Sequence, residues 1–289
     1  MSFPRTLDWF NPVMERLPAR AGSEPATIAL TDRTTMSENI CVLSYNIQAG
    51  IGTTRAHQYV TRLHQQVIST KAKTRTLRNI GLFCAGFDVV CLQEVDLGGR
   101  RAGFENQVDV LKRASRLPHA AWQENRTVRR ISRHGNAILS RARFVSCDDL
   151  KLPGKVGGRG ALIVELDMEP QTVVVCAHLS LGLEDQTEQL EFLADRLSVP
   201  KWRAARKIVC GDLNCGAKSQ PIQLFTERTR IRPLTTPQHK SYPSWSPRQA
   251  LDHILSSESR PPQDVLVEDA AWSDHRPVSA CFPANTVRG

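Results

Sequence analysis

Polar side chains that could carry out acid–base and metal chemistry stand at the ends of several apolar runs in this sequence. Glu94 follows DVVCLQ, His178 follows TVVVCA and Asp212 follows KIVCG. The whole set comprises Asn46, Glu94, His178, Asp212, Asn214, Asp252, Asp274 and His275. A carboxylate or imidazole that leaves a buried strand is costly unless it is paired, binds an ion or lies in a cleft. Because loops at strand ends are where a rigid scaffold presents catalytic groups, we expect these side chains to converge.

These residue types suit the hydrolysis of a phosphate ester, which needs charge neutralisation, a positioned water and a proton for the leaving oxygen. His275 can act as a base or bind phosphate, with Asp252 orienting its ring, and His178 is then left to act as an acid. The candidate oxygen ligands for Mg²⁺ or Mn²⁺ are the carboxylates of Glu94 and Asp274 and the amide of Asn46. A bound divalent ion would act as a Lewis acid on the phosphoryl oxygen.

The elements that must position these residues are short apolar runs, each closed by polar or glycine-rich residues. Such runs predict buried strands. They are CVLSYN, DVVCLQEV, GNAILS, ALIVEL, TVVVCAHL, KIVCGDLN, LDHILSS and PVSACF. Longer polar–apolar stretches between them predict helices at 70–86, 107–117 and 184–197. The sequence therefore predicts an α/β fold.

The length of the chain limits its domain organisation, and its net charge limits the partners that it favours. The chain has 289 residues, of which 40% are hydrophobic, and this is enough for one domain with a full core. We expect an N-terminal extension at 1–37 that can be disordered, a catalytic domain at 38–283 and a C-terminal tail at 284–289. The net charge of +9 favours anionic partners such as nucleic acid or phosphorylated lipid headgroups. A solubilising surface is an equal alternative, because the basic residues are scattered.

The eight cysteines bear on the cellular compartment. No CxxC pair and no zinc-finger spacing occurs, and several cysteines lie in apolar runs, so we expect buried thiols in a reducing compartment. The N-terminus lacks the apolar stretch of a signal peptide, and no run of about 18 apolar residues predicts a membrane span. We therefore expect a cytoplasmic protein without integral membrane association.

Seven short motifs occur in a fixed order along the chain. They are SYNIQ (44–48), LQEVD (92–96), GNAILSR (135–141), AHLS (177–180), GDLN (211–214), LDHIL (251–255) and SDHRPV (273–278). In this order they resemble the endonuclease/exonuclease/phosphatase superfamily, which includes DNase I, abasic-site endonucleases, neutral sphingomyelinases and inositol polyphosphate 5-phosphatases. The resemblance covers roughly residues 39–283. It implies a four-layer α/β sandwich of the DNase I-like type, with two packed, mainly antiparallel sheets flanked by helices and the site at one end.

The resemblance also implies roles for the metal-binding side of the site. Glu94 is similar to the principal metal ligand of the family, Asn46 lies beside it, and Asp274 resembles a carboxylate near the metal. The implied cofactor is Mg²⁺ or Mn²⁺. Gln48 stands where some relatives carry an acidic residue, so as a ligand or substrate contact it would act as a neutral group.

On the phosphate side, Asp212 resembles the residue that orients or deprotonates the attacking water. Asn214 would hold the scissile phosphate through its amide, and His275, supported by Asp252, would contact phosphate. His178 resembles a histidine near the leaving group that abasic-site endonucleases lack, which argues mildly against that branch.

Two further residues are predicted to contact the substrate, and each also has a structural interpretation that involves no substrate. Arg159, in the glycine-rich loop before ALIVEL, could donate two hydrogen bonds to phosphate, or could be a solvent-facing loop arginine. Asn136 in GNAILSR could contact substrate, or could be a polar residue that enters a strand.

Three functions compete. The first is a nuclease acting on DNA or RNA, which predicts a basic groove and salt-sensitive binding. Its best local support is a basic cluster before GNAILS, made of Arg126, Arg129, Arg130, Arg133 and His134. The second is a phosphatase or phosphodiesterase acting on phospholipid headgroups or small phosphate esters. The third, ranked low because the full residue set is present, is an inactive binding module.

Overall fold

The computed structural model describes residues 39–53, 55, 70–128, 131–155, 157–270 and 272–283. The predicted extension at 1–37 and tail at 284–289 lie outside the described residues, as do Arg129 and Arg130 of the predicted basic cluster. Residues 36–289 group into one compact unit.

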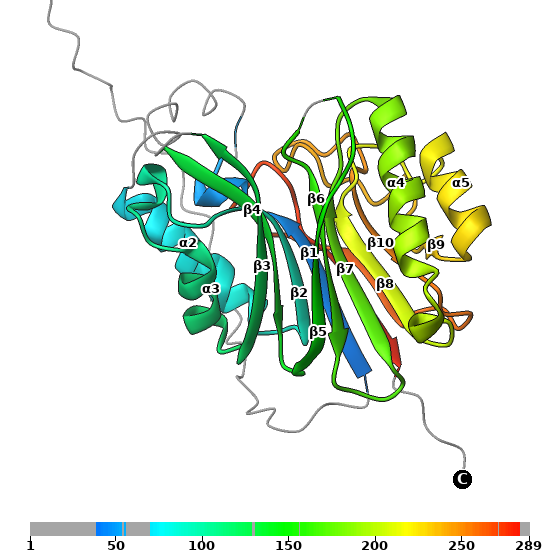
Figure 1. Cartoon of the computed structure of the whole chain (residues 1–289). Coiled ribbons are helices and arrows are strands. Elements are labelled where there is room, and N and C mark those ends of the chain that lie inside the picture. Colours follow the sequence, from blue (N-terminus) through cyan, green and yellow to red (C-terminus); the bar gives the residue numbers. More distant parts are fainter. Residues whose placement is uncertain are drawn as a thin grey trace, which may run out of the picture. The chain divides into compact units, whose positions relative to one another are not determined.

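Two six-stranded sheets form the centre of this unit (Figure 1). The first has the order β11–β12–β1–β2–β4–β3. Its strands are β1 (Asn39–Asn46), β2 (Val89–Asp96), β3 (His119–Val128), β4 (Ser132–Ser140), β11 (Asp264–Val267) and β12 (Val278–Pro283). β1 and β2 are parallel, and the other neighbours in this sheet are antiparallel.

The second sheet has the order β5–β6–β7–β8–β10–β9. Its strands are β5 (Phe144–Lys151), β6 (Gly160–Leu166), β7 (Thr172–His178), β8 (Arg206–Asp212), β9 (Arg232–Pro233) and β10 (Asp252–Ser256). Here only β7 and β8 are parallel among the described pairs. Both sheets are thus mainly antiparallel, as predicted.

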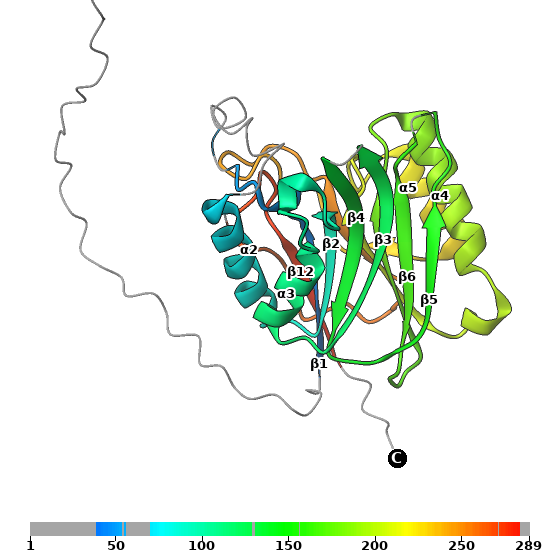
Figure 2. The same ribbon diagram turned by 60° about the vertical axis from the view of Figure 1, so that its left-hand side comes forward.

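Helices cover the outer face of each sheet (Figure 2). α2 (Lys71–Cys84) and α3 (Gln107–Ser115) pack on the first sheet, where Ile80 and Leu111 share a core with Leu43. α4 (Leu183–Leu197) and α5 (Gln220–Thr229) pack on the second, where Leu193 joins Val175. Three short 3₁₀ turns, η1 (Gln48–Gly50), η3 (Arg100–Ala102) and η4 (Pro200–Trp202), complete the described helices. The predicted four-layer α/β sandwich is confirmed.

The inner strands are apolar on both faces because each sheet is covered on both sides. Successive side chains of a strand point to opposite faces. In β7, Val173 and Val175 therefore face the helices, while Val174 and Cys176 face the other sheet. This alternation decides which residues can reach the space between the sheets.

All eight predicted strands and all three predicted helices are present, with ends shifted by a few residues. The strands β3, β5, β9 and β11 and the helix α5 were not predicted. β5 lies at the edge of its sheet and alternates half-buried and exposed residues along its whole length. Such a strand lacks the continuous apolar run that marked the inner strands.

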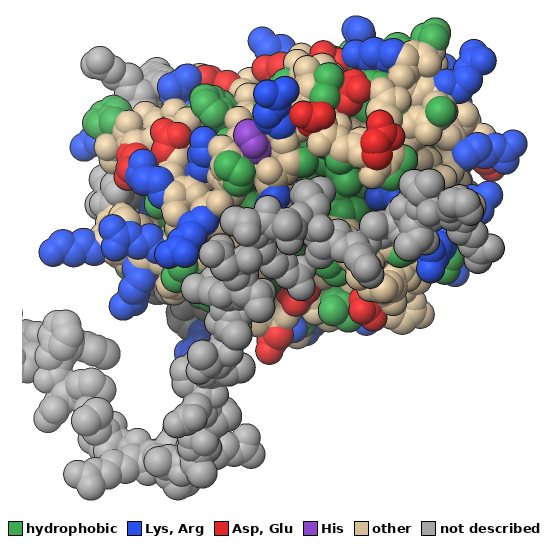
Figure 3. Space-filling view, turned by 90° about the horizontal axis from the view of Figure 1, so that it is seen from below, with side chains coloured by type: hydrophobic (Ala, Val, Ile, Leu, Met, Phe, Trp, Pro, Cys, Tyr) green, Lys and Arg blue, Asp and Glu red, His purple; other side chains and the backbone are tan. Residues whose placement is uncertain are grey.

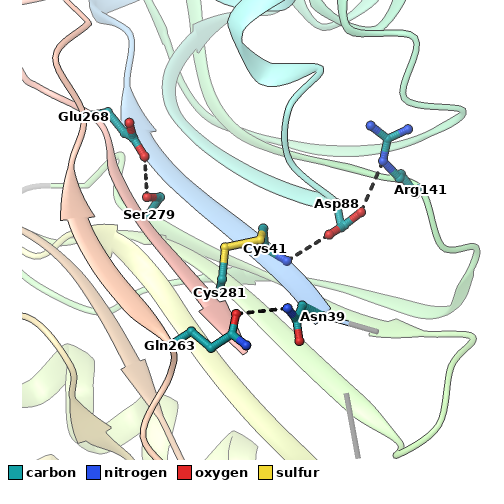
Figure 4. The surroundings of a disulfide bond; sticks show 8 residues. All are labelled: Asn39, Cys41, Asp88, Arg141, Gln263, Glu268, Ser279 and Cys281. Carbon is teal, nitrogen blue, oxygen red and sulfur yellow. Dashed lines mark hydrogen bonds and ion pairs between the residues drawn. A yellow bond between two sulfur atoms is a disulfide. The ribbon is translucent and has the colours of Figure 1, made fainter. Parts of the chain in front are cut away.

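The predicted thiols of Cys41 and Cys281 are instead joined in a disulfide between β1 and β12, with 4.1 Å between the Cα atoms (Figure 4). The two cysteines are direct cross-strand partners, and the sequence, which separates them by 240 residues, gives no sign of this. The remaining six are free, and all but the exposed Cys147 are buried. The expected reducing, cytoplasmic compartment rested on free thiols, so it loses that support and stays a prediction.

The surface charge is mixed in the view from below, where basic, acidic and apolar side chains are interspersed (Figure 3). This agrees with the scattered basic residues of the sequence. No helix among the described residues is long and apolar enough to cross a membrane.

Candidate active site

Most of the predicted site residues lie on the inner faces of the two sheets, at one end of their strands. In β7 His178 continues the inward row of Val174 and Cys176, and in β8 Asp212 continues the row of Ile208 and Cys210. The strand register then pairs Asp212 with His178 on one side and with Asp252 of β10 on the other. Three neighbouring strands thus present an imidazole and two carboxylates side by side.

The first sheet adds Asn46 and Glu94 from the ends of β1 and β2. Regular alternation would turn residue 94 toward the helices, in line with Val90 and Leu92. A β-bulge between Leu92 and Val95 changes this, and Glu94 adopts a φ of 57°. Bulges next to active sites commonly re-aim a side chain in this way.

Asn46 connects the two sheets at the centre of the site. Its Nδ2 donates to Oε1 of Glu94 at 3.2 Å and to Oδ2 of Asp212 at 3.0 Å. Its Oδ1 accepts the backbone N–H of Gln48 at 3.1 Å. Asn46 therefore orders the two carboxylates through its nitrogen, and its predicted role as an oxygen ligand stays a prediction.

Gln48 and Asp274 lie together beside this group. Gln48 donates from Nε2 to Oδ2 of Asp274 at 3.1 Å. Its Oε1 is buried and has no hydrogen-bond partner among the described residues. The backbone of Gln48 is left-handed, with a φ of 46°, as are those of Glu94 and of Asn214 at 53°. Strained residues of this kind cluster at functional sites.

His275 is held between two buried carboxylates. Its Nδ1 lies 2.7 Å from Oδ2 of Asp252, and its Nε2 lies 3.7 Å from Oδ2 of Asp212. Burial alone would lower the pKa of His275, but the charges of Asp252 and Asp212 outweigh it and raise this pKa well above its usual value. His275 is therefore a buried cation at neutral pH.

Asp212 and Glu94 both bind protons more tightly than free carboxylates do. Burial raises the pKa of Asp212 to about 7, against the opposing charge of His275. Burial also raises the pKa of Glu94, and the nearby charge of Asp274 adds to this effect. Two buried carboxylates with raised pKa values at one end of the sandwich make this cluster the candidate functional site.

His178 and Arg159 form a second pair at the rim. Nη1 of Arg159 lies 2.6 Å from Nε2 of His178, which itself lies 3.6 Å from Oδ2 of Asp212. Since a guanidinium can only donate, this nitrogen of His178 accepts. Burial and the charge of Arg159 lower the pKa of His178 well below its usual value, so the ring is neutral. Arg159 thus contacts a predicted site residue, and its predicted hydrogen bonds to phosphate stay a prediction.

Asn214 and Asn136 make contacts that shape the site. Asn214 donates from Nδ2 to the carbonyl of Leu179 at 2.9 Å, and its backbone N–H donates to Oδ1 of Asp212 at 3.1 Å. Asn136 is fully buried and donates to the carbonyl of Gly160 at 2.9 Å, which ties β4 to β6 across the sheets. The predicted phosphate and substrate contacts of both asparagines stay predictions.

The donor set fits a divalent ion beside Glu94. Asp212, Asp252 and His275 bring possible ligand atoms within 4.8 Å of one another, but a protonated His275 bound to Asp252 cannot ligate a metal. The like charge of Asp274 contributes to the raised pKa of Glu94, and a bound cation would relieve this repulsion. The unpaired Oε1 of Gln48 adds a neutral oxygen at the same place.

Two residues that support His275 were not predicted. Ser241 donates from Oγ to Oδ2 of Asp252 at 2.5 Å, and the ring of Tyr242 lies 4.7 Å from that of His275, centre to centre. Both stand in the connection between β9 and β10. Nothing in their spacing links them to His275, which follows more than 30 positions later.

Comparison with known proteins agrees with the fold described above. A search of curated protein sequences found no match. Among solved structures, an endonuclease/exonuclease/phosphatase from Beutenbergia cavernae has a TM-score of 0.64 at 20% identity, covering 85% of this chain and 72% of that one. The human Nocturnin catalytic domain with bound sulfate has a TM-score of 0.63 at 16% identity, with coverages of 85% and 94%. Sphingomyelinase C from Streptomyces griseocarneus has a TM-score of 0.62 at 19% identity, with coverages of 84% and 99%.

At these identities the structures establish the fold. The family follows from the sequence model of the Endonuclease/Exonuclease/phosphatase family, which matches residues 43–275. That span runs from within β1 to His275 and includes every predicted site residue. The chain therefore belongs to the endonuclease/exonuclease/phosphatase family, whose enzymes hydrolyse phosphate esters.

Proposed function

We propose that this chain is a metal-dependent phosphodiesterase, with DNA or RNA as its first candidate substrate. The observation that carries the proposal is the convergence of Asp212, His275 and Asp252 with Glu94 at one end of the inner sheet faces. A buried base, a buried cation and a separate carboxylate pair supply the functions that phosphate-ester hydrolysis needs.

Asp212 is the residue we assign to the attacking water. It accepts from Asn46, and the imidazoles of His178 and His275 flank its Oδ2 at 3.6 and 3.7 Å. A base with a pKa of about 7 is well matched to proton transfer near neutral pH. Asn46 and the backbone N–H of Asn214 fix the carboxylate in place.

His275 and Arg159 are the two positive groups that we assign to the phosphoryl oxygens. Asp252 keeps His275 protonated, and Ser241 and Tyr242 hold its ring and its partner in place. We assign the neutral His178 to positioning Arg159, which it contacts through Nε2. Donors that are fixed before the reaction stabilise developing negative charge without reorganisation.

Glu94 and Asp274, with Gln48 beside them, are the residues we expect to hold Mg²⁺ or Mn²⁺. A bound divalent ion neutralises charge on the phosphoryl oxygen. Asn46 and Gln48 donate from their amide nitrogens to Glu94 and Asp274, respectively, and so orient these carboxylates.

The structure leaves fewer basic residues available to bind nucleic acid than the sequence predicted. Of the predicted basic cluster, Arg133 forms an ion pair with Glu124 at 2.5 Å and a hydrogen bond to the carbonyl of Leu97. Arg126 lies against the loop at Gly158, near Arg159, and is exposed. A second candidate, a diesterase of small phosphate esters or lipid headgroups, is favoured by a cavity beside Arg159.

The test is a Mg²⁺ and Mn²⁺ titration against plasmid DNA, RNA, bis-p-nitrophenyl phosphate and p-nitrophenyl phosphate. Wild type is compared with His275→Ala and with His119→Ala, a control histidine that packs against Phe144 away from the site. We expect metal-dependent cleavage of diesters by wild type and His119→Ala, and its loss in His275→Ala. Turnover of the monoester alone would contradict a diesterase, and no turnover of any substrate would favour a binding module.

A further inference from the structure

We propose that the cavity lined by Lys155, Arg159 and residues 180–185 binds an apolar or aromatic substituent of the diester substrate. This inference rests on the proposed function and extends it to a substrate class. The cavity measures about 630 Å³ and has Arg159, Leu181 and Leu183 in its wall. Ligand sites in proteins commonly fall in the range of about 300–1,000 Å³.

The two leucines are unusual in being exposed together in a concave surface. Leu181 is 78% exposed and Leu183 is 53% exposed, and both line the same cavity. A single exposed leucine is common in soluble proteins and needs no explanation. Two that face one cavity form an apolar surface that contributes nothing to the core and suits a ligand.

The segment that carries these leucines is fixed by buried glutamines of α4. Gln189 accepts from the backbone N–H of Ser180 and donates to its Oγ, both at 2.9 Å. Gln186 donates to the carbonyl of Ser180 at 2.9 Å. Gln189 also donates to the carbonyl of Pro153 at 2.7 Å, which ties the opposite wall to the same helix. The cavity is thus preformed, and a ligand need not order its walls.

Arg159 makes the cavity continuous with the proposed active site. It lines the cavity and contacts His178, which lies 3.6 Å from Oδ2 of Asp212. A phosphate held by Arg159 beside Asp212 would therefore place one of its ester substituents against Leu181 and Leu183. In the cavity wall Lys155 is paired with Glu184 at 2.5 Å, so these two charges cancel. Besides Arg159, the remaining charge is the carboxylate of Asp185, which accepts the backbone N–H of Lys155 at 3.2 Å. The leucine side of the wall suits an uncharged group such as a nucleobase or a short alkyl chain.

The first test measures binding without catalysis. The probe is 1-anilinonaphthalene-8-sulfonate, which combines an anion with aromatic rings and becomes fluorescent in apolar sites. We expect saturable binding to wild type that weakens about tenfold, equal to about 1.4 kcal/mol, in the double variant Leu181→Ser/Leu183→Ser. The matched control is Leu82→Ser/Leu266→Ser, which removes two leucines that are 61% and 51% exposed outside this cavity. Equal binding by both double variants would overturn the proposal.

The second test separates this inference from the proposed function. KM and kcat are measured for bis-p-nitrophenyl phosphate, aromatic at both positions, and for glycerophosphoglycerol, hydrophilic at both. In the double variant Leu181→Ser/Leu183→Ser, called the cavity variant, we expect KM to rise about tenfold for the aromatic diester only. Its kcat should stay within about twofold of the wild-type value. An unchanged KM, or an equal rise for both diesters, would overturn the cavity proposal and leave the diesterase standing.

If wild type turns over neither diester, the proposed function fails, and the fluorescence comparison still decides whether the cavity binds an apolar anion. Inhibition by phenyl phosphate and by hexyl phosphate then distinguishes an aromatic from an alkyl substituent. Stronger inhibition by either one, lost in the cavity variant, supports the proposal, and inhibition that the variant does not change counts against it. Leu181→Ser alone provides the same readouts if the double variant loses melting temperature.

Discussion

The two ends of the inner sheet faces differ in chemistry although the same strands form both. In β8 the inward row changes from Ile208 through Cys210 to Asp212, and in β10 it changes from Ile254 to Asp252. The first part of each row packs in the core between the sheets. The position at the other end, Asp212 in β8 and Asp252 in β10, lies in the polar cluster of the candidate active site. Alternation therefore decides the face of a residue, and its place along the strand decides whether it serves stability or the site.

The two ends also differ in the kind of buried polar atom that is left without a partner. At the apolar end Asp88 accepts the backbone N–H of Cys41 at 2.9 Å and pairs with Arg141 at 3.2 Å, beside the disulfide (Figure 4). At the polar end, buried oxygens of Gln48 and Asp252 have no hydrogen-bond partner among the described residues. At the apolar end the unpaired atom among the described residues is Nη2 of Arg206, a donor whose Nε pairs with Glu258 at 2.8 Å, whereas the unpaired atoms at the polar end are oxygens, the atom type that a divalent cation binds.

Two conservative substitutions, one at the polar end and one at the apolar end of the inner sheet faces, should differ most strongly in their effects. Asp212→Asn removes the proposed base, and we expect kcat to fall by about 10²–10⁴ with little change in melting temperature. Asp88→Asn weakens the Arg141 pair and the contact with Cys41, so it should lower melting temperature and leave kcat unchanged. Diester hydrolysis and thermal unfolding of both variants check this. The contrast breaks down if Asp212→Asn keeps wild-type turnover.

The Asp252–His275 pair should control the alkaline limb of activity. Asp252 helps raise the pKa of His275, so Asp252→Asn lowers this pKa and His275 loses its proton at a lower pH. We expect the alkaline limb of kcat to move to lower pH, with a fall of about 10–100-fold at neutral pH. Ser256→Ala, at the apolar end of the same strand, is the control. An unshifted pH profile would show that protonated His275 is not needed.

The disulfide should serve stability alone. Cys41→Ser/Cys281→Ser opens a link between residues 240 positions apart, and we expect a loss of about 2–4 kcal/mol in unfolding free energy. KM and kcat of the folded variant should match those of wild type, because β12 carries the bond at the end remote from Asp212. Thermal unfolding with and without reductant measures the effect. Loss of activity in the folded variant would contradict the separation of the two ends.

A smaller effect is expected from His134, which lies near the site but outside the proposed chemistry. Burial, reinforced by the charge of Arg101, lowers the pKa of His134 to about 4. Since the unfolded chain binds this proton more readily, its contribution is present at neutral pH and is lost as pH falls below the unfolded value of about 6.5. Between pH 7 and pH 5 wild type should lose about 1–2 kcal/mol more than His134→Gln. Parallel pH profiles of melting temperature would contradict this.

Much of the fold could be predicted because inner strands are continuous apolar runs and their ends are marked by polar residues. The same signal identified Asp212 and His178, since both simply extend an inward row by two positions. Edge strand β5 lacks such a run, and the Cys41–Cys281 bond depends on which strands become neighbours.

The finer geometry of the site could not be predicted because it depends on contacts between distant segments. The bulge at Glu94 appears only in the register of β2 against β4. The pairing of Arg159 with His178, and the support of His275 by Ser241 and Tyr242, follow from loops whose paths the sequence does not determine.

The most direct test of the central claim is a Mn²⁺ titration of bis-p-nitrophenyl phosphate hydrolysis by wild type, Glu94→Gln and Glu105→Gln. Glu105 is an exposed acid paired with Arg113 and serves as the matched control. We expect no turnover in the presence of a chelator and a saturable rise of turnover with Mn²⁺ in wild type and Glu105→Gln. In Glu94→Gln the half-saturating Mn²⁺ concentration should be at least about tenfold higher. Full turnover in chelator, or the same Mn²⁺ dependence in all three proteins, would contradict a metal-dependent site at Glu94.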